Sequence, residues 1–330
     1  MTTVGIPRAL LFWSYAPLWL GFFRSLGLTP VVSRETTRET MDRGVRLAVD
    51  EACLPVKVFF GHCAELAETV DWLFVPRLVS VERRKYICPK FMGLPDMVRQ
   101  PFGDRTRLLD PVVDFLKAGP DALPAVAGEL GKRLGVDGRT SRRALDEGLA
   151  ALRRLREQQE RGVLPEDALA GQGWLPVREA PPRPCDKAKL TVGVLGHPYN
   201  VHDRQISFGL VDRLAGWGVK AITGDNLPAE TCRAAASELP KDLFWTLGWH
   251  TYGAAVHFMS SPGVAGLIHL VSFGCGPDSL VGELVRHRAE AAGTPFLLIT
   301  LDEHTGEAGF LTRVEAFVDM LERRGAVAGR

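Results

Sequence analysis

Apolar runs of strand length alternate with segments of helical periodicity along most of the chain. In the first part, the predicted strands are residues 3–6, 29–33, 56–60 and 72–75. The helices predicted among them are residues 15–26, 42–52 and 65–68. This alternation is typical of a parallel sheet whose strands are joined by helical crossovers. The first part is therefore predicted to be an α/β lobe.

The last part of the chain repeats the pattern. Its predicted strands are residues 190–195, 219–223, 266–271 and 296–300, and its predicted helices are residues 205–217, 278–291 and 310–323. Between the two parts, leucines recur at helical spacing within a charged stretch, at Leu145, Leu149, Leu152 and Leu155. The prolines of residues 178–187 favour an extended linker.

These patterns predict an α/β fold class with two parallel-sheet lobes and a helical insert between them. The expected division is an N-terminal α/β lobe at residues 1–100, a helical insert with a Pro-rich linker at 101–188, and a C-terminal α/β lobe at 189–330.

Charge and cysteine content limit the classes of partner and the cellular compartment that we expect. Lys and Arg number 40 against 39 Asp and Glu, and a net charge of +1 gives no field that would attract nucleic acid. Six cysteines in 330 residues are too sparse for a secreted disulfide framework. The apolar residues 9–28 are interrupted by Ser14, Pro17 and Arg24, and no cleavage site follows. We therefore expect a cytoplasmic protein with no nucleic-acid or membrane partner.

The cysteines fall into two groups according to their neighbours. Cys53, Cys88 and Cys275 lie in predicted loops beside Pro or Gly, whereas Cys63 and Cys232 lie in or beside helical patterns and Cys185 lies in the linker. The strand before Cys275 runs straight into it, and a helix is predicted to begin just after it. Loops that leave the carboxyl ends of parallel strands converge on a ligand-binding crevice, so Cys275 is expected to reach one.

Three loop thiols from distant segments suggest a metal centre. The chain contains no C-x-x-C pair, which argues against structural zinc. A [4Fe–4S] cluster tolerates dispersed cysteines, and three of them would leave one iron open to another ligand. Ordinary buried thiols fit the spacing equally well, because free cysteine is among the most buried residue types.

Two further residues are candidates for catalysis. His197 follows the strand 190–195 and is expected to reach the crevice, where it would hydrogen-bond to a cluster sulfide or protonate a substrate. The alternative role of His197 is to cap the next turn. Glu303 follows the last predicted strand and is a candidate acid or base, although carboxylates there also favour the N-terminus of the next helix.

Several long motifs occur in a fixed order. The first lobe contains Val4-Gly5-Ile6-Pro7-Arg8-Ala9, Asp50-Glu51-Ala52-Cys53-Leu54-Pro55-Val56-Lys57 with Gly61-His62, and Cys88-Pro89-Lys90 with Gly93-Leu94-Pro95-Asp96. The second contains Gly196-His197-Pro198-Tyr199-Asn200, Phe273-Gly274-Cys275-Gly276-Pro277-Asp278-Ser279 and Asp302-Glu303-His304-Thr305-Gly306-Glu307-Ala308-Gly309. Together they resemble the domain fused to, or encoded beside, ATP-dependent activators of 2-hydroxyacyl-CoA dehydratases.

The resemblance implies a relative of the dehydratase subunits and of the double-cubane cluster proteins. Those proteins use two Rossmann-like lobes to hold a [4Fe–4S] cluster on three cysteines. By their positions in the motifs, the corresponding ligands in this sequence are Cys53, Cys88 and Cys275. The cluster is expected to be a single cube or a sulfide-bridged double cubane. An activator ATPase of the acetate kinase and actin type is the implied partner, because this sequence shows no Walker-type phosphate loop.

Three functions follow as hypotheses. The first is an iron–sulfur redox protein of anaerobic metabolism that takes low-potential electrons from the activator and passes them on, or reduces a small substrate at the open iron. The second is a 2-hydroxyacyl-CoA dehydratase subunit, a lyase that would bind an acyl-CoA. The third is a non-catalytic docking module for the activator ATPase. A homodimer is expected under the first hypothesis.

Overall fold

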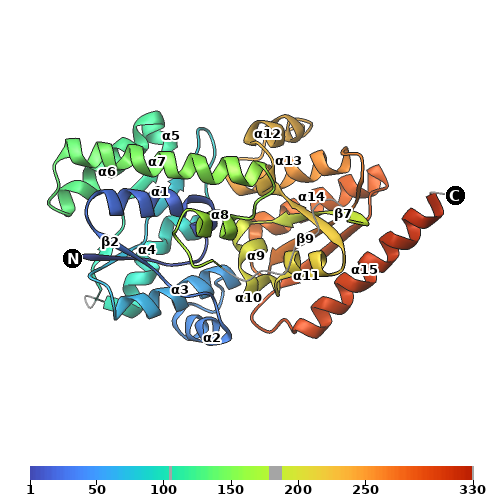
Figure 1. Cartoon of the computed structure of the whole chain (residues 1–330), viewed down its shortest axis with the longest axis horizontal. Helices are drawn as coiled ribbons and strands as arrows, with labels where there is room; N and C mark the ends of the chain where they lie inside the picture. The colour runs from blue at the N-terminus through green and yellow to red at the C-terminus, as the bar shows by residue number, and fades with distance from the viewer. Residues whose placement is uncertain (104–105, 178–187, 329–330) are drawn as a thin grey trace. The chain divides into compact units, whose positions relative to one another are not determined.

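The computed structural model describes residues 1–103, 106–177 and 188–328 (Figure 1). The chain forms two compact units. Unit 1 comprises Met1–Gln158, Leu164–Val177 and Leu243–Thr246, and unit 2 comprises Gln159–Val163, Arg178–Asp242 and Leu247–Arg330. The predicted linker at 178–187 lies outside the described residues, and the predicted domain boundaries stay a prediction.

Unit 1 is built on a parallel sheet. Its strands are β1 (Thr3–Ile6), β2 (Thr29–Val32), β3 (Trp72–Phe74) and β5 (Leu108–Leu109), in the order β2-β1-β3-β5. A second parallel pair joins β4 (Arg77–Ser80) to β6 (Val112–Asp114). The Phe74 ring at the end of β3 packs against Trp19 and Phe23, with ring centroids 4.8 and 5.2 Å away. These aromatic contacts join the sheet to the first helix.

Helices account for most of the rest of unit 1. They are α1 (Phe12–Ser25), α2 (Arg38–Leu47), α3 (Leu54–Ala67), α4 (Pro89–Phe102), α5 (Phe115–Ala118), α6 (Ala122–Arg133), α7 (Gly138–Glu160) and α8 (Pro165–Gly171), with a short 3₁₀ turn, η2 (Gly119–Asp121). α7 is the predicted amphipathic helix. Its Leu145, Leu152 and Leu155 are buried, whereas most of its charged residues are exposed.

The strand predicted at 56–60 is wrong, because these residues lie inside α3. Val56, Val58, Phe59 and Phe60 are all buried, so consecutive positions of this helix face the interior and no amphipathic period results. A short apolar run of this kind does not by itself distinguish a buried strand from a buried helix. Pro55 in the first turn of the helix is the local feature that favours helix.

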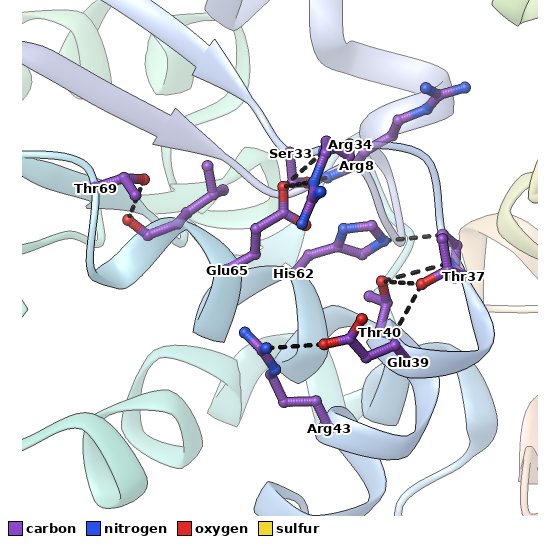
Figure 2. A network of polar contacts seen from close by, with 12 residues as sticks. Arg8, Ser33, Arg34, Thr37, Glu39, Thr40, Arg43, His62, Glu65 and Thr69 are labelled. Atoms are coloured by element: carbon purple, nitrogen blue, oxygen red, sulfur yellow. Dashed lines mark hydrogen bonds and ion pairs between the residues drawn. The ribbon is translucent and has the colours of Figure 1, made fainter.

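Helices α2 and α3 are so close that the backbone of each helix contacts the backbone of the other. A Cβ atom placed on Gly44 would lie 1.8 Å from the Lys57 carbonyl oxygen, and one on Gly61 would lie 2.0 Å from that of Thr40. Polar contacts surround this crossing (Figure 2). The imidazole Nε2 of buried His62 lies 2.9 Å from the Thr36 hydroxyl, and Thr37 caps α2 by accepting a hydrogen bond from the Thr40 N–H.

Unit 2 contains the second parallel sheet. Its strands are β7 (Leu190–Gly196), β8 (Val219–Thr223), β9 (Val264–Ser272) and β10 (Phe296–Leu301), in the order β10-β9-β7-β8. Its helices are α9 (Pro198–His202), α10 (Arg204–Ser207), α11 (Leu210–Gly216), α12 (Ala229–Ala236), α13 (Thr246–Met259), α14 (Gly276–Ala292) and α15 (Glu307–Ala328), and η3 (Gly224–Asn226) is a 3₁₀ turn. The single helix predicted at 205–217 is interrupted, because Phe208 and Gly209 adopt left-handed backbone with φ of 49° and 64°.

The two sheets confirm the predicted fold class, α/β with Rossmann-like parallel-sheet lobes. Within the described residues, no helix is both long and apolar enough to cross a membrane. The apolar residues 9–28 form the end of the loop after β1, the helix α1 and the turn that leads to β2, and most of them are buried in unit 1.

Candidate functional site

Each of the three predicted ligand cysteines stands at the N-cap position of a helix. Cys53 precedes α3, Cys88 precedes α4 and Cys275 precedes α14. Proline occupies the first or second position of each helix, where its missing N–H costs no hydrogen bond. Because the first N–H groups of a helix have no partner within the helix, each thiol lies where backbone donors and the positive end of the helix dipole favour an anionic sulfur.

Cys53 and Cys88 belong to unit 1 and act on each other electrostatically. Cys53 is buried and Cys88 is half-buried. Burial raises the pKa of the Cys53 thiol, while the Lys90 ammonium and the Val56 N–H oppose this rise and the Cys88 thiol adds to it. Lys90 is held in place because its Nζ donates to the Glu51 carbonyl oxygen at 3.0 Å. Two thiols and a cation therefore share one neighbourhood.

Cys275 meets two other potential ligands in unit 2. One ligand atom each from Cys275, His197 and Asp278 lies within 4.8 Å of the other two, and all three residues are buried. The local sequences explain this placement. Gly196 and Gly274, with φ of 141° and 73°, turn the chain just before His197 and Cys275 at the carboxyl ends of the neighbouring strands β7 and β9. His197 and Cys275 thus lie at the carboxyl ends of adjacent strands, and a ligand-binding crevice at this edge stays a prediction.

The carboxylate of Asp278 lies between two imidazoles. Its Oδ1 is 3.2 Å from Nε2 of His269 and 3.8 Å from Nε2 of His197. Burial disfavours the charged form of Asp278, yet the two imidazoles hold its pKa below the usual value. Burial lowers the pKa of His197, which is therefore neutral near pH 7. Nδ1 of His197 lies 2.6 Å from the Tyr199 hydroxyl, which fixes the orientation of the ring.

Several polar atoms of this buried group lack hydrogen-bond partners among the described residues. They are His197 Nε2, His269 Nδ1, Asp278 Oδ2 and Asn200 Nδ2. Leaving such atoms buried and unpaired costs stability, and they therefore mark a place for a bound group or water. The sequence reasoning did not single out Asp278 or His269 as site residues. The available signals were a histidine within an apolar strand and an acidic residue within the Cys275 motif.

Glu303 lies in the turn after β10, half-buried. It is not part of the group of Cys275, His197 and Asp278. The neighbouring Asp302 has a structural part, since its Oδ1 accepts hydrogen bonds from the Thr305 hydroxyl and the His304 N–H. Catalysis by His197 and Glu303 stays a prediction.

The remaining described cysteines have the properties of packing residues. Cys63 is fully buried in α3, and burial raises its thiol pKa well above the usual value. Burial and the nearby Asp225 raise the pKa of Cys232, in α12, to about 12. Both thiols lie within helices, unlike Cys53, Cys88 and Cys275 at helix N-cap positions, and their exclusion from the ligand set stays a prediction. Cys185 lies outside the described residues.

The donor chemistry fits an iron–sulfur cluster. Thiolates at helix N-termini offer sulfur ligands next to backbone N–H groups that hydrogen-bond to sulfide. The buried, unpaired atoms of His197 and Asp278 add nitrogen and oxygen donors beside Cys275. The candidate donors are thus Cys53 and Cys88 in unit 1, and Cys275 with His197 and Asp278 in unit 2; a cluster held by the three cysteines stays a prediction.

Fold and site together define an α/β protein with parallel sheets and with three cysteines at helix N-cap positions. The comparison with protein families makes this specific: residues 3–227 match the CoA enzyme activase uncharacterised domain (DUF2229), and the chain belongs to this family. The match includes Cys53, Cys88 and His197, whereas Cys275 and Asp278 lie beyond it. No curated protein matches the chain.

Proposed function

We propose that the chain is an iron–sulfur redox protein that holds a [4Fe–4S] cluster on Cys53, Cys88 and Cys275. When bound, such a cluster supplies one-electron chemistry at low potential. The observation that carries the proposal is that all three motif cysteines lie at the N-cap position of a helix with a proline in its first two residues, while Cys63 and Cys232 lie within helices. Because the three belong to both units, the proposal requires the units to bring them within the span of one cluster.

The surroundings of the thiols support a cluster that accepts electrons. Lys90 near Cys53 and the three helix N-termini place positive charge where a reduced cluster would gain negative charge. The family description, CoA enzyme activase, supports an activator ATPase as electron donor. We propose that this partner hydrolyses ATP and that the chain described here passes the electron on or reduces a small substrate.

A second candidate is a mononuclear metal site in unit 2 alone. Imidazole, thiolate and carboxylate within 4.8 Å of one another form the mixed donor set that catalytic zinc sites use. In that case Cys275 would bind metal without help from Cys53 or Cys88. The dehydratase-subunit and docking-module hypotheses have no such specific observation in their favour.

Metal analysis of single-thiol variants separates these candidates. The protein is purified without oxygen, and iron and acid-labile sulfide are measured for C53S, C88S and C275S, with C63A and C232A as matched buried controls. We expect each of the first three to lose most iron and sulfide, and the controls to retain both. Metal loss in C275S alone, without sulfide in the native protein, would replace the proposal by the mononuclear site.

The partner is tested separately. The activator ATPase is mixed with the purified protein, ATP and a low-potential reductant, and the reduction of the chromophore is followed by its absorbance. We expect reduction that depends on ATP. Reduction that is equally fast without ATP would contradict the proposed electron donor while leaving the ligand set intact.

A further inference from the structure

Unit 1 contains a cavity that the proposed function does not use. Its volume is about 270 Å³, and its walls come from β1 and the loop after it, from α1, α3 and α4, and from α7. The lining is almost wholly aliphatic or aromatic, as in Leu11, Phe12, Trp19, Phe59, Phe91 and Leu152. A cavity with such walls excludes charged ligands from its interior and favours an apolar chain or ring.

Two polar side chains, Tyr15 and Arg156, interrupt this apolar lining. Arg156 is exposed, so the cavity approaches solvent at this side chain, whereas Tyr15 is half-buried. Burial raises the pKa of the Tyr15 hydroxyl, with Arg156 opposing the rise and Glu82 adding to it. The hydroxyl is therefore a protonated donor at neutral pH. Within the described part of the chain, neither Tyr15 nor Arg156 has a hydrogen-bond or ion-pair partner.

The volume limits the size of a ligand. An apolar cavity of about 150 Å³ holds benzene, so by proportion a cavity of 270 Å³ has space for about ten heavy atoms. A linear chain of about eight to ten carbons fills that space and leaves its end group at the opening. The Arg156 guanidinium and the Tyr15 hydroxyl are the two donor groups of the lining that interact electrostatically, and donors of these kinds recognise a carboxylate.

The backbone of the loop after β1 supports a ligand site. Leu10, which lines the cavity, has a left-handed φ of 53° although it is not glycine, and it is buried. Such strained residues persist only where packing holds them, and they gather at ligand sites. The strain is therefore a second observation at the same cavity, independent of the polar pair.

We propose that this cavity binds a medium-chain carboxylate of about eight to ten carbons, with its chain among the apolar walls and its carboxylate at Tyr15 and Arg156. The proposal does not depend on the cluster. A ligand of the same chain length with a neutral end group would lack the ionic interaction with the Arg156 guanidinium.

Titration calorimetry tests the proposal, with decanoate as the probe and decanol as the neutral probe of equal length. We expect saturable binding of decanoate, and R156Q is expected to weaken it about threefold to tenfold. R154Q is the matched control, because Arg154 is exposed on the same helix and does not line the cavity. Equal binding of decanol and decanoate, or equal effects of R156Q and R154Q, would overturn the role of the carboxylate.

A second variant tests the location. A16F places a ring into the cavity, because Ala16 lines it and is 1% exposed. Binding is expected to disappear while the circular dichroism spectrum is unchanged. If A16F fails to fold, L149W on the half-buried part of the lining replaces it. Retained binding in a folded filling variant, or no saturable binding by the native protein, would overturn the proposal.

Discussion

A single buried imidazole makes unit 1 sensitive to acid. Burial, with a smaller contribution from the nearby Arg8 guanidinium, lowers the pKa of His62 to about 3, whereas an unfolded histidine titrates near 6.5. Between these values the unfolded state binds the additional proton. The free energy of unfolding therefore falls as pH decreases through this window, by at most about 1.4 kcal/mol per pH unit for this residue.

This prediction is tested by urea unfolding of the native protein and H62Q at pH 7.5 and pH 5. The native protein is expected to lose about 2 kcal/mol more than H62Q between the two pH values, because glutamine does not titrate. For each protein, the free energy of unfolding at pH 5 is subtracted from that at pH 7.5, so any effect of the substitution that does not depend on pH cancels. Equal losses in the two proteins would show that His62 is protonated in the folded state.

A buried ion pair joins Arg8 to Glu166 of α8. The guanidinium and carboxylate are 2.5 Å apart, and both side chains are nearly inaccessible to solvent. R8M removes the Arg8 guanidinium from beside this buried carboxylate, which is expected to cost about 3–5 kcal/mol in urea unfolding. The double variant R8M/E166L removes both charges and is expected to recover most of that loss. A cost below about 1 kcal/mol for R8M would indicate that water reaches Glu166.

At the residue scale, the sequence predicted where the thiols lie along the secondary structure better than it predicted which residues surround them. Proline and glycine beside Cys53, Cys88 and Cys275 are local signals, and they correctly indicated positions at the ends of elements. Asp278 and His269 meet only because α14 packs on β9. No local pattern in the sequence contains that tertiary contact.

Among the elements, the crossing of α2 and α3 is the most sensitive to side-chain size. Gly44 and Gly61 each face a carbonyl oxygen of the other helix at distances that no Cβ atom can adopt. G44A and G61A must push the helices apart and are expected to lower the free energy of unfolding by about 1–3 kcal/mol. Urea unfolding at neutral pH measures the effect.

G128A provides the matched control for this prediction. Gly128 lies within α6, is exposed, and has open space where a Cβ atom would be added. Alanine there is expected to raise stability by about 0.5–1 kcal/mol, because it has the higher helix propensity. If G61A were as harmless as G128A, the close contact of the two helices would be wrong.

The sequence predicted elements well where length and period were both informative. β1, β7, β8, β10 and α14 lie close to their predicted bounds, and α7 forms where leucines recur at helical spacing. It failed for α3, whose burial on all sides removes the helical period, and for α10 and α11, where the left-handed Phe208 breaks a continuous pattern. β5 and β6 are too short to produce a pattern of their own.

At the scale of the whole molecule, the repeated strand–helix alternation was sufficient to predict two parallel-sheet lobes. Parallel strands need helical crossovers, and both sheets consist of parallel pairs. The proposed ligand set draws on both of these lobes. It therefore cannot follow from the pattern of either lobe, and it depends on the motifs that both carry.

The central claim is that this chain holds a [4Fe–4S] cluster on three cysteines. Electron paramagnetic resonance of the dithionite-reduced, anaerobically purified protein tests it most directly, with iron counted per chain. We predict the resonance of a reduced cluster in the native protein with about four iron atoms per chain for a single cube, or about eight for a double cubane. The resonance should persist in C63A and vanish in C53S, C88S and C275S. A native protein that remains free of iron and without resonance after reconstitution would contradict the account.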